Sequence, residues 1–223
     1  MFPLYEVRRI WINQDKRMYA LWKDLIQKAG LSPDEEVDYT VGVFIGEKLV
    51  ATGSYQENIL KCLVVCKEYQ SENFLTKLVV HLLGELQMKG ITHTFVYTKP
   101  ENKAIFYSLG FREILSTETV LFMEQGTPNL SSYLSMLSKL NHSENASAIV
   151  MNANPFTKGH LFLVQQAAKV SSHVYVFVLS ENRSEFSFTD RLAMVKAGVS
   201  QIANVTVVPV SYTHLTLPTT ERV

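Results

Sequence analysis

The sequence predicts an α/β protein in two parts, an N-terminal mixed sheet with helices followed by the start of a Rossmann-like parallel sheet. Three observations support this expectation. Short apolar strands at hairpin spacing are followed by a long amphipathic helix within residues 1–125. A polar break follows near residue 141, and a strand, a loop, a helix and a second strand come after it. A chain of 223 residues is long enough for two such units.

Residues 1–125 alternate between helical and extended patterns. Apolar residues at helical spacing predict a helix over 16–29, which Gly30 ends. The remaining expected elements are strands over 39–45, 49–55 and 59–66, a helix over 73–89, a strand over 92–97, a short helix near 101–108 and one extended segment over 111–123.

Residues 126–145 have the composition of a linker, with a turn cluster, a short helix over 130–140 and a polar break. After it, residues 146–209 begin a second domain. Its first strand covers 148–151, its loop 152–158 and its helix 159–170, and the apolar run 174–179 is typical of a strand buried on both faces. The inward helix residues are expected to be Leu163, Val164, Ala167 and Ala168. A right-handed crossover then places the first loop at the carboxyl edge of the sheet, where open α/β folds bind ligands.

The charge balance excludes some classes of partner. Lys plus Arg equals Asp plus Glu at 21 each, which argues against nucleic acid or an anionic membrane as the main partner. The first residues carry charges where a signal peptide needs an apolar core, and no apolar run reaches the ~18 residues of a membrane span, so we expect a cytoplasmic protein. Cys62 and Cys66 are expected to be reduced core thiols, and no metal site is expected around them.

The loop between the first strand and helix of the second part holds the candidate chemistry. Unpaired amides at a helix start attract phosphate, and Gly159 allows a ligand to approach the backbone closely. On the first turn, His160 can donate a hydrogen bond to a phosphate oxygen, while Thr157 and Lys158 add a hydroxyl and a positive charge.

This loop resembles a known signature. Thr157-Lys158-Gly159-His160 resembles the (H/T)xGH motif of nucleotidyltransferases, which transfer AMP or CMP from a nucleoside triphosphate. The longer string 148–160 is similar to citrate lyase ligases, and residues 181–192 fit the same family. The resemblance implies catalytic roles for His160, Thr157 and Lys158. It implies nucleotide binding by Asn152, Asn154, Pro155, Phe156, Gly159 and Arg191, with Arg191 opening a helix beside the nucleotide. The alternative for Arg191 is a surface charge on that helix.

Residues 97–111 resemble the closing motif of GNAT acyltransferases, which implies that Asn102 and Tyr107 lie near the sulfur of coenzyme A. The sequence departs from that family at its phosphate loop. Asn73 and Leu75 stand where GNAT proteins have Gly and Gly or Ala, and a Cβ there obstructs the approach of a phosphate. We therefore do not expect acetyl-CoA as an acetyl donor. A groove for a CoA-like arm, lined by Gln70, Asn73, Asn102 and Tyr107, remains a hypothesis.

The citrate lyase ligase resemblance implies ATP-dependent activation of acetate with release of diphosphate. The acetyl group then passes to the prosthetic-group thiol of the citrate lyase acyl-carrier subunit. ATP, acetate and that subunit are the implied substrates and partners, with Mg²⁺ expected alongside ATP. Three alternatives remain open: an acetyl-CoA-dependent GNAT N-acetyltransferase, a non-catalytic module that binds the carrier, and an adenylyltransferase acting on a cofactor precursor.

Residues 210–223 are expected to be an artefactual tail. The stretch Val210–Thr219 resembles the translation of a sequencing-library adaptor, and residues 146–209 are short for a nucleotidyltransferase domain. The Ser/Thr-rich phosphate loop that the superfamily carries later in the chain has no match here. These observations predict a truncated chain, in which His214 has no catalytic role.

Overall fold

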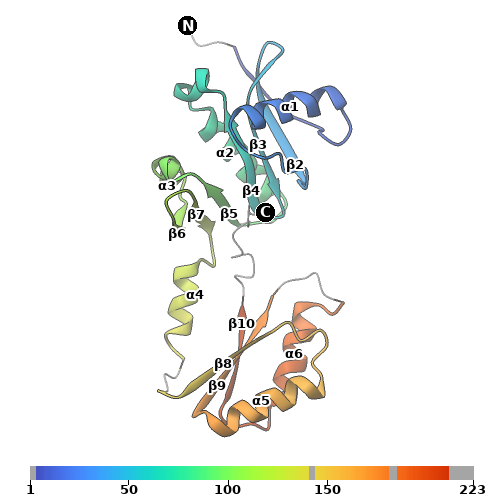
Figure 1. Ribbon diagram of the computed structural model, residues 1–223, viewed down its shortest axis with the longest axis vertical. Helices are drawn as coiled ribbons and strands as arrows, with labels where there is room; N and C mark the ends of the chain where they lie inside the picture. Colours follow the sequence, from blue (N-terminus) through green and yellow to red (C-terminus); the bar gives the residue numbers. More distant parts are fainter. Residues whose placement is uncertain (1–3, 141–143, 181–184, 211–223) are drawn as a thin grey trace. The chain divides into compact units, whose positions relative to one another are not determined.

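The chain divides between Tyr133 and Leu134 into two units, Met1–Tyr133 and Leu134–Val223. The computed structural model describes residues 4–140, 144–180 and 185–210 (Figure 1). The division falls in helix α4 (Leu130–Leu137), inside the segment 126–145 that the sequence analysis treats as a linker. The predicted fold class is confirmed, because a mixed sheet with helices is followed by a parallel one.

Seven strands form the sheet of the first unit, in the order β1-β2-β3-β4-β5-β7-β6. Their bounds are β1 (Glu6–Arg9), β2 (Tyr39–Ile45), β3 (Lys48–Gln56), β4 (Ile59–Val65), β5 (His93–Thr98), β6 (Arg112–Ser116) and β7 (Leu121–Gly126). Neighbours are antiparallel except β4 and β5, which run parallel. The β4–β5 register covers only Ile59 with Phe95 and Leu60 with Val96, so pairing between these strands stops after two residues.

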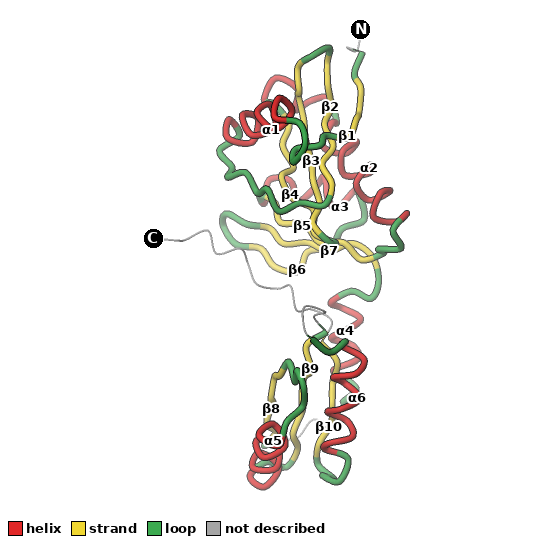
Figure 2. The backbone as a smooth tube through the Cα atoms, turned by 90° about the vertical axis from the view of Figure 1, so that its right-hand side faces the viewer, coloured by secondary structure: helices red, strands yellow, loops and turns green. Residues whose placement is uncertain are grey.

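Helices α1 (Lys16–Lys28) and α2 (Phe74–Met88) lie on opposite faces of this sheet (Figure 2). Two apolar cores result. Trp22 and Ile26 of α1 are buried in one, and Leu78 and Leu82 of α2 are buried in the other. The remaining helical segments are η1 (Lys67–Glu72), η2 (Pro100–Asn102) and α3 (Lys103–Ser108). Each predicted helix of this unit is therefore present, within a few residues of its expected bounds.

Two expectations for the first unit need correction. The segment 111–123 is not one extended element but the hairpin of β6 and β7, turned where Thr117 Oγ1 accepts a hydrogen bond from Val120 N at 3.0 Å. Strand β1 was not predicted. It has only four residues and carries a Glu and two Arg, so its pairing with β2 leaves no period-two apolar pattern to detect.

The second unit has three parallel strands in the order β10-β9-β8. Its elements are β8 (Ala146–Met151), α5 (Lys158–Val170), β9 (His173–Leu179), α6 (Phe188–Val199) and β10 (Val205–Val210). Val164 of α5 and Val195 of α6 pack with the alternating valines of β9 in one core. Strand, loop, helix and strand follow one another as the sequence predicts.

Three details of the second unit differ from the expectation. Leu163 was expected to face inward, but it is 51% exposed because Val164 occupies the inward position of that turn. Val210 was assigned to the artefactual tail, yet it is the last residue of β10 and pairs with Leu179. Gly126, the first residue of the expected linker, ends β7. The rest of the expected tail, residues 211–223 with His214, lies outside the described residues.

Cys62 and Cys66 are free thiols, partly buried against the core that α1 covers, as the sequence predicts. Among the described residues, no helix is both long enough and apolar enough to cross a membrane.

Candidate active site

The loop that follows β8 runs from Asn152 to Thr157 and leads directly into α5. In a parallel sheet the carboxyl ends of the strands share one edge, so this loop and the segment after β9 leave the sheet on the same side. Thr157 is extended, with φ −110° and ψ 168°, and its side chain caps the helix. The sequence folds this way because Thr is a favoured N-cap residue.

Thr157 and His160 form a reciprocal capping box at the start of α5. Thr157 Oγ1 accepts a hydrogen bond from His160 N at 3.5 Å, and Thr157 N donates one to His160 Nδ1 at 3.0 Å. The hydroxyl Oγ1 also lies 2.9 Å from Nδ1. His therefore takes the third helical position that Glu or Gln usually fills in this motif.

The capping box decides which nitrogen of His160 carries the proton. A ring nitrogen that accepts from a backbone N–H has no hydrogen of its own, so the neutral imidazole of His160 is protonated at Nε2. The ring is held at Nδ1 and presents an Nε2–H donor away from Thr157. This is the geometry needed for donation to an anionic oxygen.

Phe156 holds the other side of the His160 ring. The two rings stack with centroids 5.6 Å apart and planes inclined by 19°. Phe156 in turn lies against Gly198 of α6, where a Cβ would come within 2.7 Å of Phe156 Cδ1. Gly198 is thus a site residue that sequence reasoning missed. A glycine inside a predicted helix is noticeable in the sequence, but the sequence does not show that the Phe156 ring occupies the space left by the missing side chain.

Arg191 is the largest polar side chain buried in the second unit, with 0% exposure. Its Nη1 donates to Asn152 O at 2.7 Å, to Asn152 Oδ1 at 2.6 Å and to Leu179 O at 2.8 Å. Its Nε donates to Phe186 O at 3.2 Å. The alternative of a surface helix charge is therefore wrong. The guanidinium joins the ends of β8 and β9 to the segment that precedes α6.

The other expected nucleotide-binding residues also lie in or beside this loop. Asn154 Oδ1 accepts from Phe186 N at 3.0 Å, a second link to the segment before α6. Lys158 and Gly159 are exposed on the first turn of α5. A Cβ at Gly159 would lie 3.6 Å from Thr157 Oγ1, an ordinary contact, so the fold itself does not require glycine there. A requirement for glycine at this position would come from a ligand.

The four expected groove residues of the first unit lie in two places. Gln70 is exposed in η1, and Asn73 precedes α2 with φ 56°, a left-handed conformation that Asn tolerates better than most residues other than Gly. Asn102 Nδ2 donates to Thr98 Oγ1 at 2.8 Å near the end of β5. Tyr107 is 42% exposed on α3, with the Arg112 guanidinium 5.5 Å from its ring.

The structure does not bring these four residues together by direct contact. Among the described residues, no hydrogen bond or ring contact joins Gln70 or Asn73 to Asn102 or Tyr107. Leu75, which the sequence analysis treats as an obstruction, packs partly buried against the core beside α2. The described residues also contain no group of three or more His, Cys, Asp or Glu side chains that could hold a metal ion.

Comparison with known proteins finds similar sequences for both units. The citrate lyase ligase C-terminal domain matches residues 146–216. A citrate (pro-3S)-lyase ligase from Escherichia coli K12 is 38% identical over 201 residues, covering 89% of this chain and 57% of that relative. The corresponding ligase of Haemophilus influenzae is 31% identical over 198 residues, covering 87% and 59%. Over about nine-tenths of its length, the chain is similar to citrate lyase ligases.

The chain spans 57–60% of the length of the citrate lyase ligases that it matches. Both units are included in these matches, since each covers about nine-tenths of the chain. The domain match ends at residue 216 and so includes residues 210–216 of the expected tail.

Other similar proteins match one unit. A phosphopantetheine adenylyltransferase of Prochlorococcus marinus is 40% identical over 73 residues, covering 31% of this chain and 44% of that enzyme. A ribosomal-protein-S18-alanine N-acetyltransferase structure from Escherichia coli has 15% identity and a TM-score of 0.44, covering 55% of this chain and 94% of that one.

Proposed function

We propose that the chain carries the nucleotide-binding site of a ligase that acetylates the prosthetic-group thiol of the citrate lyase acyl-carrier subunit. The observation that carries this proposal is the capping box, which holds His160 at Nδ1 and presents its Nε2–H beside the first amides of α5. The box lies in the segment that matches the citrate lyase ligase C-terminal domain.

In the proposed reaction an acetate oxygen attacks the α-phosphorus of ATP, diphosphate leaves, and acetyl-AMP forms. The thiol sulfur of the carrier then attacks the acetyl carbonyl carbon, AMP leaves, and the thiol proton is released to solvent or base. His160 donates its Nε2 hydrogen to a phosphate oxygen whose charge grows during transfer. Lys158, exposed on the same first turn of α5, adds a positive charge. Mg²⁺ bound together with ATP would neutralise part of the charge on its phosphates.

Arg191 and Asn152 were expected from the sequence to bind the nucleotide, whereas in this proposal they hold the loop in place. The Arg191 guanidinium donates hydrogen bonds to Asn152 O, Asn152 Oδ1 and Leu179 O, so it positions the loop and orients Asn152. Pro155 and Asn154 shape the same loop, and Phe156 sets the plane of the His160 ring. The nucleotide then contacts the exposed first turn of α5 at Gly159.

Isothermal calorimetry with ATP, combined with acetate-dependent exchange of labelled diphosphate into ATP, tests the proposal. We expect His160→Ala to lower exchange by about 10²–10³-fold, the usual loss when one donor to a developing charge is removed. Lys169→Ala, in the last turn of α5, is the matched control and should leave exchange unchanged. Exchange that is equal in the His160→Ala variant and the parent chain would refute the role of His160.

A second candidate is an adenylyltransferase that acts on a phosphopantetheine-like acceptor, which the 40% identity over 73 residues favours. The choice of acceptor separates the two candidates. Exchange that requires acetate supports the ligase, and exchange that requires 4′-phosphopantetheine supports the adenylyltransferase. We favour the ligase because its relatives match both units of this chain.

The first unit has a separate part in the proposal. The opening beyond the two paired residues of β4 and β5 is offered as the place for the pantetheine arm, flanked by Gln70, Asn73, Asn102 and Tyr107. Calorimetry with coenzyme A and dephospho-coenzyme A tests this step, and no heat from either would refute it. Release of thiol from acetyl-CoA would instead support an N-acetyltransferase, and carrier binding without diphosphate exchange would support a non-catalytic module.

A further inference from the structure

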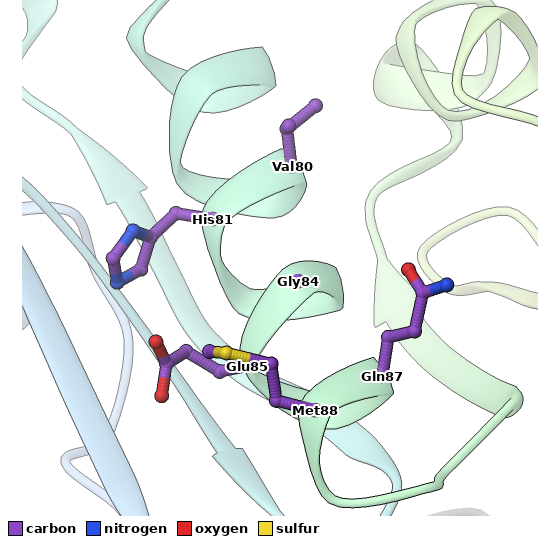
Figure 3. Close-up of a pocket in the computed structure, with 6 residues that line it drawn as sticks. All are labelled: Val80, His81, Gly84, Glu85, Gln87 and Met88. Carbon is purple, nitrogen blue, oxygen red and sulfur yellow. The ribbon is translucent and has the colours of Figure 1, made fainter.

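The outer face of α2 carries a shallow groove of about 590 Å³, lined by Val80, His81, Gly84, Glu85, Gln87 and Met88 (Figure 3). We call these six residues the α2 groove. Two of its apolar side chains are strongly exposed, Val80 at 55% and Met88 at 76%. The opposite side of the same helix is fully occupied, since Leu78, Leu82 and Leu86 are buried in the core.

The presence of glycine at position 84, inside this helix, is not explained by contacts within the chain. Glycine inside an exposed helix costs about 1 kcal/mol relative to alanine. A Cβ at Gly84 would meet no atom within 4 Å, so nothing in this chain requires the absence of a side chain there. Val80, Gly84 and Met88 are spaced by four residues and form one row, with the glycine as a gap between two larger side chains. Such a gap allows a second helix to approach closely.

The polar side chains of the α2 groove determine how a second copy of the helix can be arranged against it. His81 and Glu85 project to one side of the helix, and Val80 and Gln87 project to the other (Figure 3). His81 Nε2 lies 2.9 Å from Tyr39 Oη, which leaves Nδ1 for a further contact. When two copies of one helix pack antiparallel about a two-fold axis, like flanks meet. His81 of one copy then lies opposite Glu85 of the other, twice in the same interface.

We propose that α2 pairs antiparallel with α2 of a second copy of this chain, with the axis near Gly84. The row of Val80, Gly84 and Met88 packs at the centre, and His81 meets Glu85 of the partner subunit on one flank. An interface of one helix from each copy is small, so the dimer forms and dissociates with concentration. The contacts between His81 and Glu85 fix the register and add little affinity, because exposed polar pairs are strongly solvated.

Sedimentation equilibrium of the full chain across a hundredfold range of concentration tests this pairing. We expect a monomer–dimer equilibrium in the parent chain. His81→Glu places two carboxylates opposite each other, and Gly84→Leu fills the point of close approach, so each should weaken dimerisation at least tenfold. The double variant H81E/E85K reverses both charges and should restore the dimer. Glu118→Lys, an exposed acidic residue in the turn between β6 and β7, is the control and should leave it unchanged.

Circular dichroism of each variant separates loss of pairing from loss of fold. A parent chain that stays monomeric at the highest concentration would overturn the proposal. A dimer that withstands both single substitutions would overturn it as well. A dimer that H81E weakens and H81E/E85K does not restore would refute the antiparallel register.

Discussion

Thr157 supports both the helix and the catalytic histidine proposed above. Its hydroxyl caps α5, and its backbone N–H fixes the proton position of His160. We expect Thr157→Val to destabilise the second unit by about 1 kcal/mol, the typical value of an N-cap side chain. Thr157→Ser keeps the hydroxyl and should recover most of that loss. Urea denaturation followed by circular dichroism measures both, and equal stability of the two variants would contradict the capping role.

Arg191 carries a larger share of the stability of the second unit. Replacing it with leucine leaves the carbonyl groups of Asn152 and Leu179 without their donor. Hydrogen bonds from a charged group are each worth about 1.5–3 kcal/mol, so we expect Arg191→Leu to cost roughly 3 kcal/mol or more. Arg191→Lys keeps the positive charge but has a single donor nitrogen in place of Nη1 and Nε, so its stability should lie between those of the parent chain and the leucine variant. In denaturation experiments, a variant as stable as the parent chain would show that the buried guanidinium is replaceable.

The two thiols of the first unit should react slowly. Burial raises the pKa of Cys62 and of Cys66, so at pH 8 less of each is present as the nucleophilic thiolate than in a free cysteine. We expect alkylation by iodoacetamide to be slow in the native chain and to reach the free-cysteine rate in urea. Mass spectrometry of quenched samples measures this, and rapid native labelling of both residues would contradict it.

At the scale of elements, helix α4 is fixed to the first unit through a buried carboxylate. Glu124 Oε1 accepts from Leu130 N at 2.7 Å, at the first residue of α4, while its Oε2 lies 2.8 Å from His93 Nε2. Replacing Glu124 by alanine removes the acceptor and should speed hydrogen exchange at the start of α4 on the order of tenfold. Glu124→Gln keeps an acceptor oxygen and serves as the control. Unchanged exchange in the alanine variant would refute this link.

The elements were largely predictable because their patterns are local. Helices α1, α2 and α5 follow from apolar spacing and stop signals, and β9 follows from its continuous apolar run. That run was expected to be buried on both faces, but only the valine face of β9 is fully buried. The β6–β7 hairpin was missed because its turn at residues 117–120 contains no glycine or proline. Strand β1 exists only through its pairing with β2, which no local pattern reports.

The candidate site was predictable in its place but not in its contacts. The loop, the helix start and His160 follow from chain order and residue type. The burial of Arg191 depends on a carbonyl 39 residues away at Asn152, and the need for Gly198 depends on the ring of Phe156. Both are properties of tertiary packing, which residue patterns along the chain do not contain.

At the scale of the whole molecule, the two units are expected to unfold separately. Both tryptophans of the chain, Trp11 and Trp22, belong to the first unit, so their fluorescence reports on that unit alone. Circular dichroism reports on both. We expect the two signals to follow different denaturation curves, and Arg191→Leu to move the circular dichroism curve while leaving the fluorescence midpoint unchanged. Coincident curves for the parent chain would indicate one cooperative unit.

The hydrogen bonds of Arg191 also limit whether the loop can be transferred to another protein. Residues 152–160 look like a self-contained motif, yet the carbonyl and amide groups of Asn152 depend on α6, and Phe156 depends on a glycine of the same helix. A short graft of the loop and α5 into another scaffold would keep the capping box, whose partners are three residues apart. The graft would lose the backbone conformation of residues 152–156, which lead into the capping box. Transfer of His160 in its native conformation therefore requires the whole segment from β8 through α6.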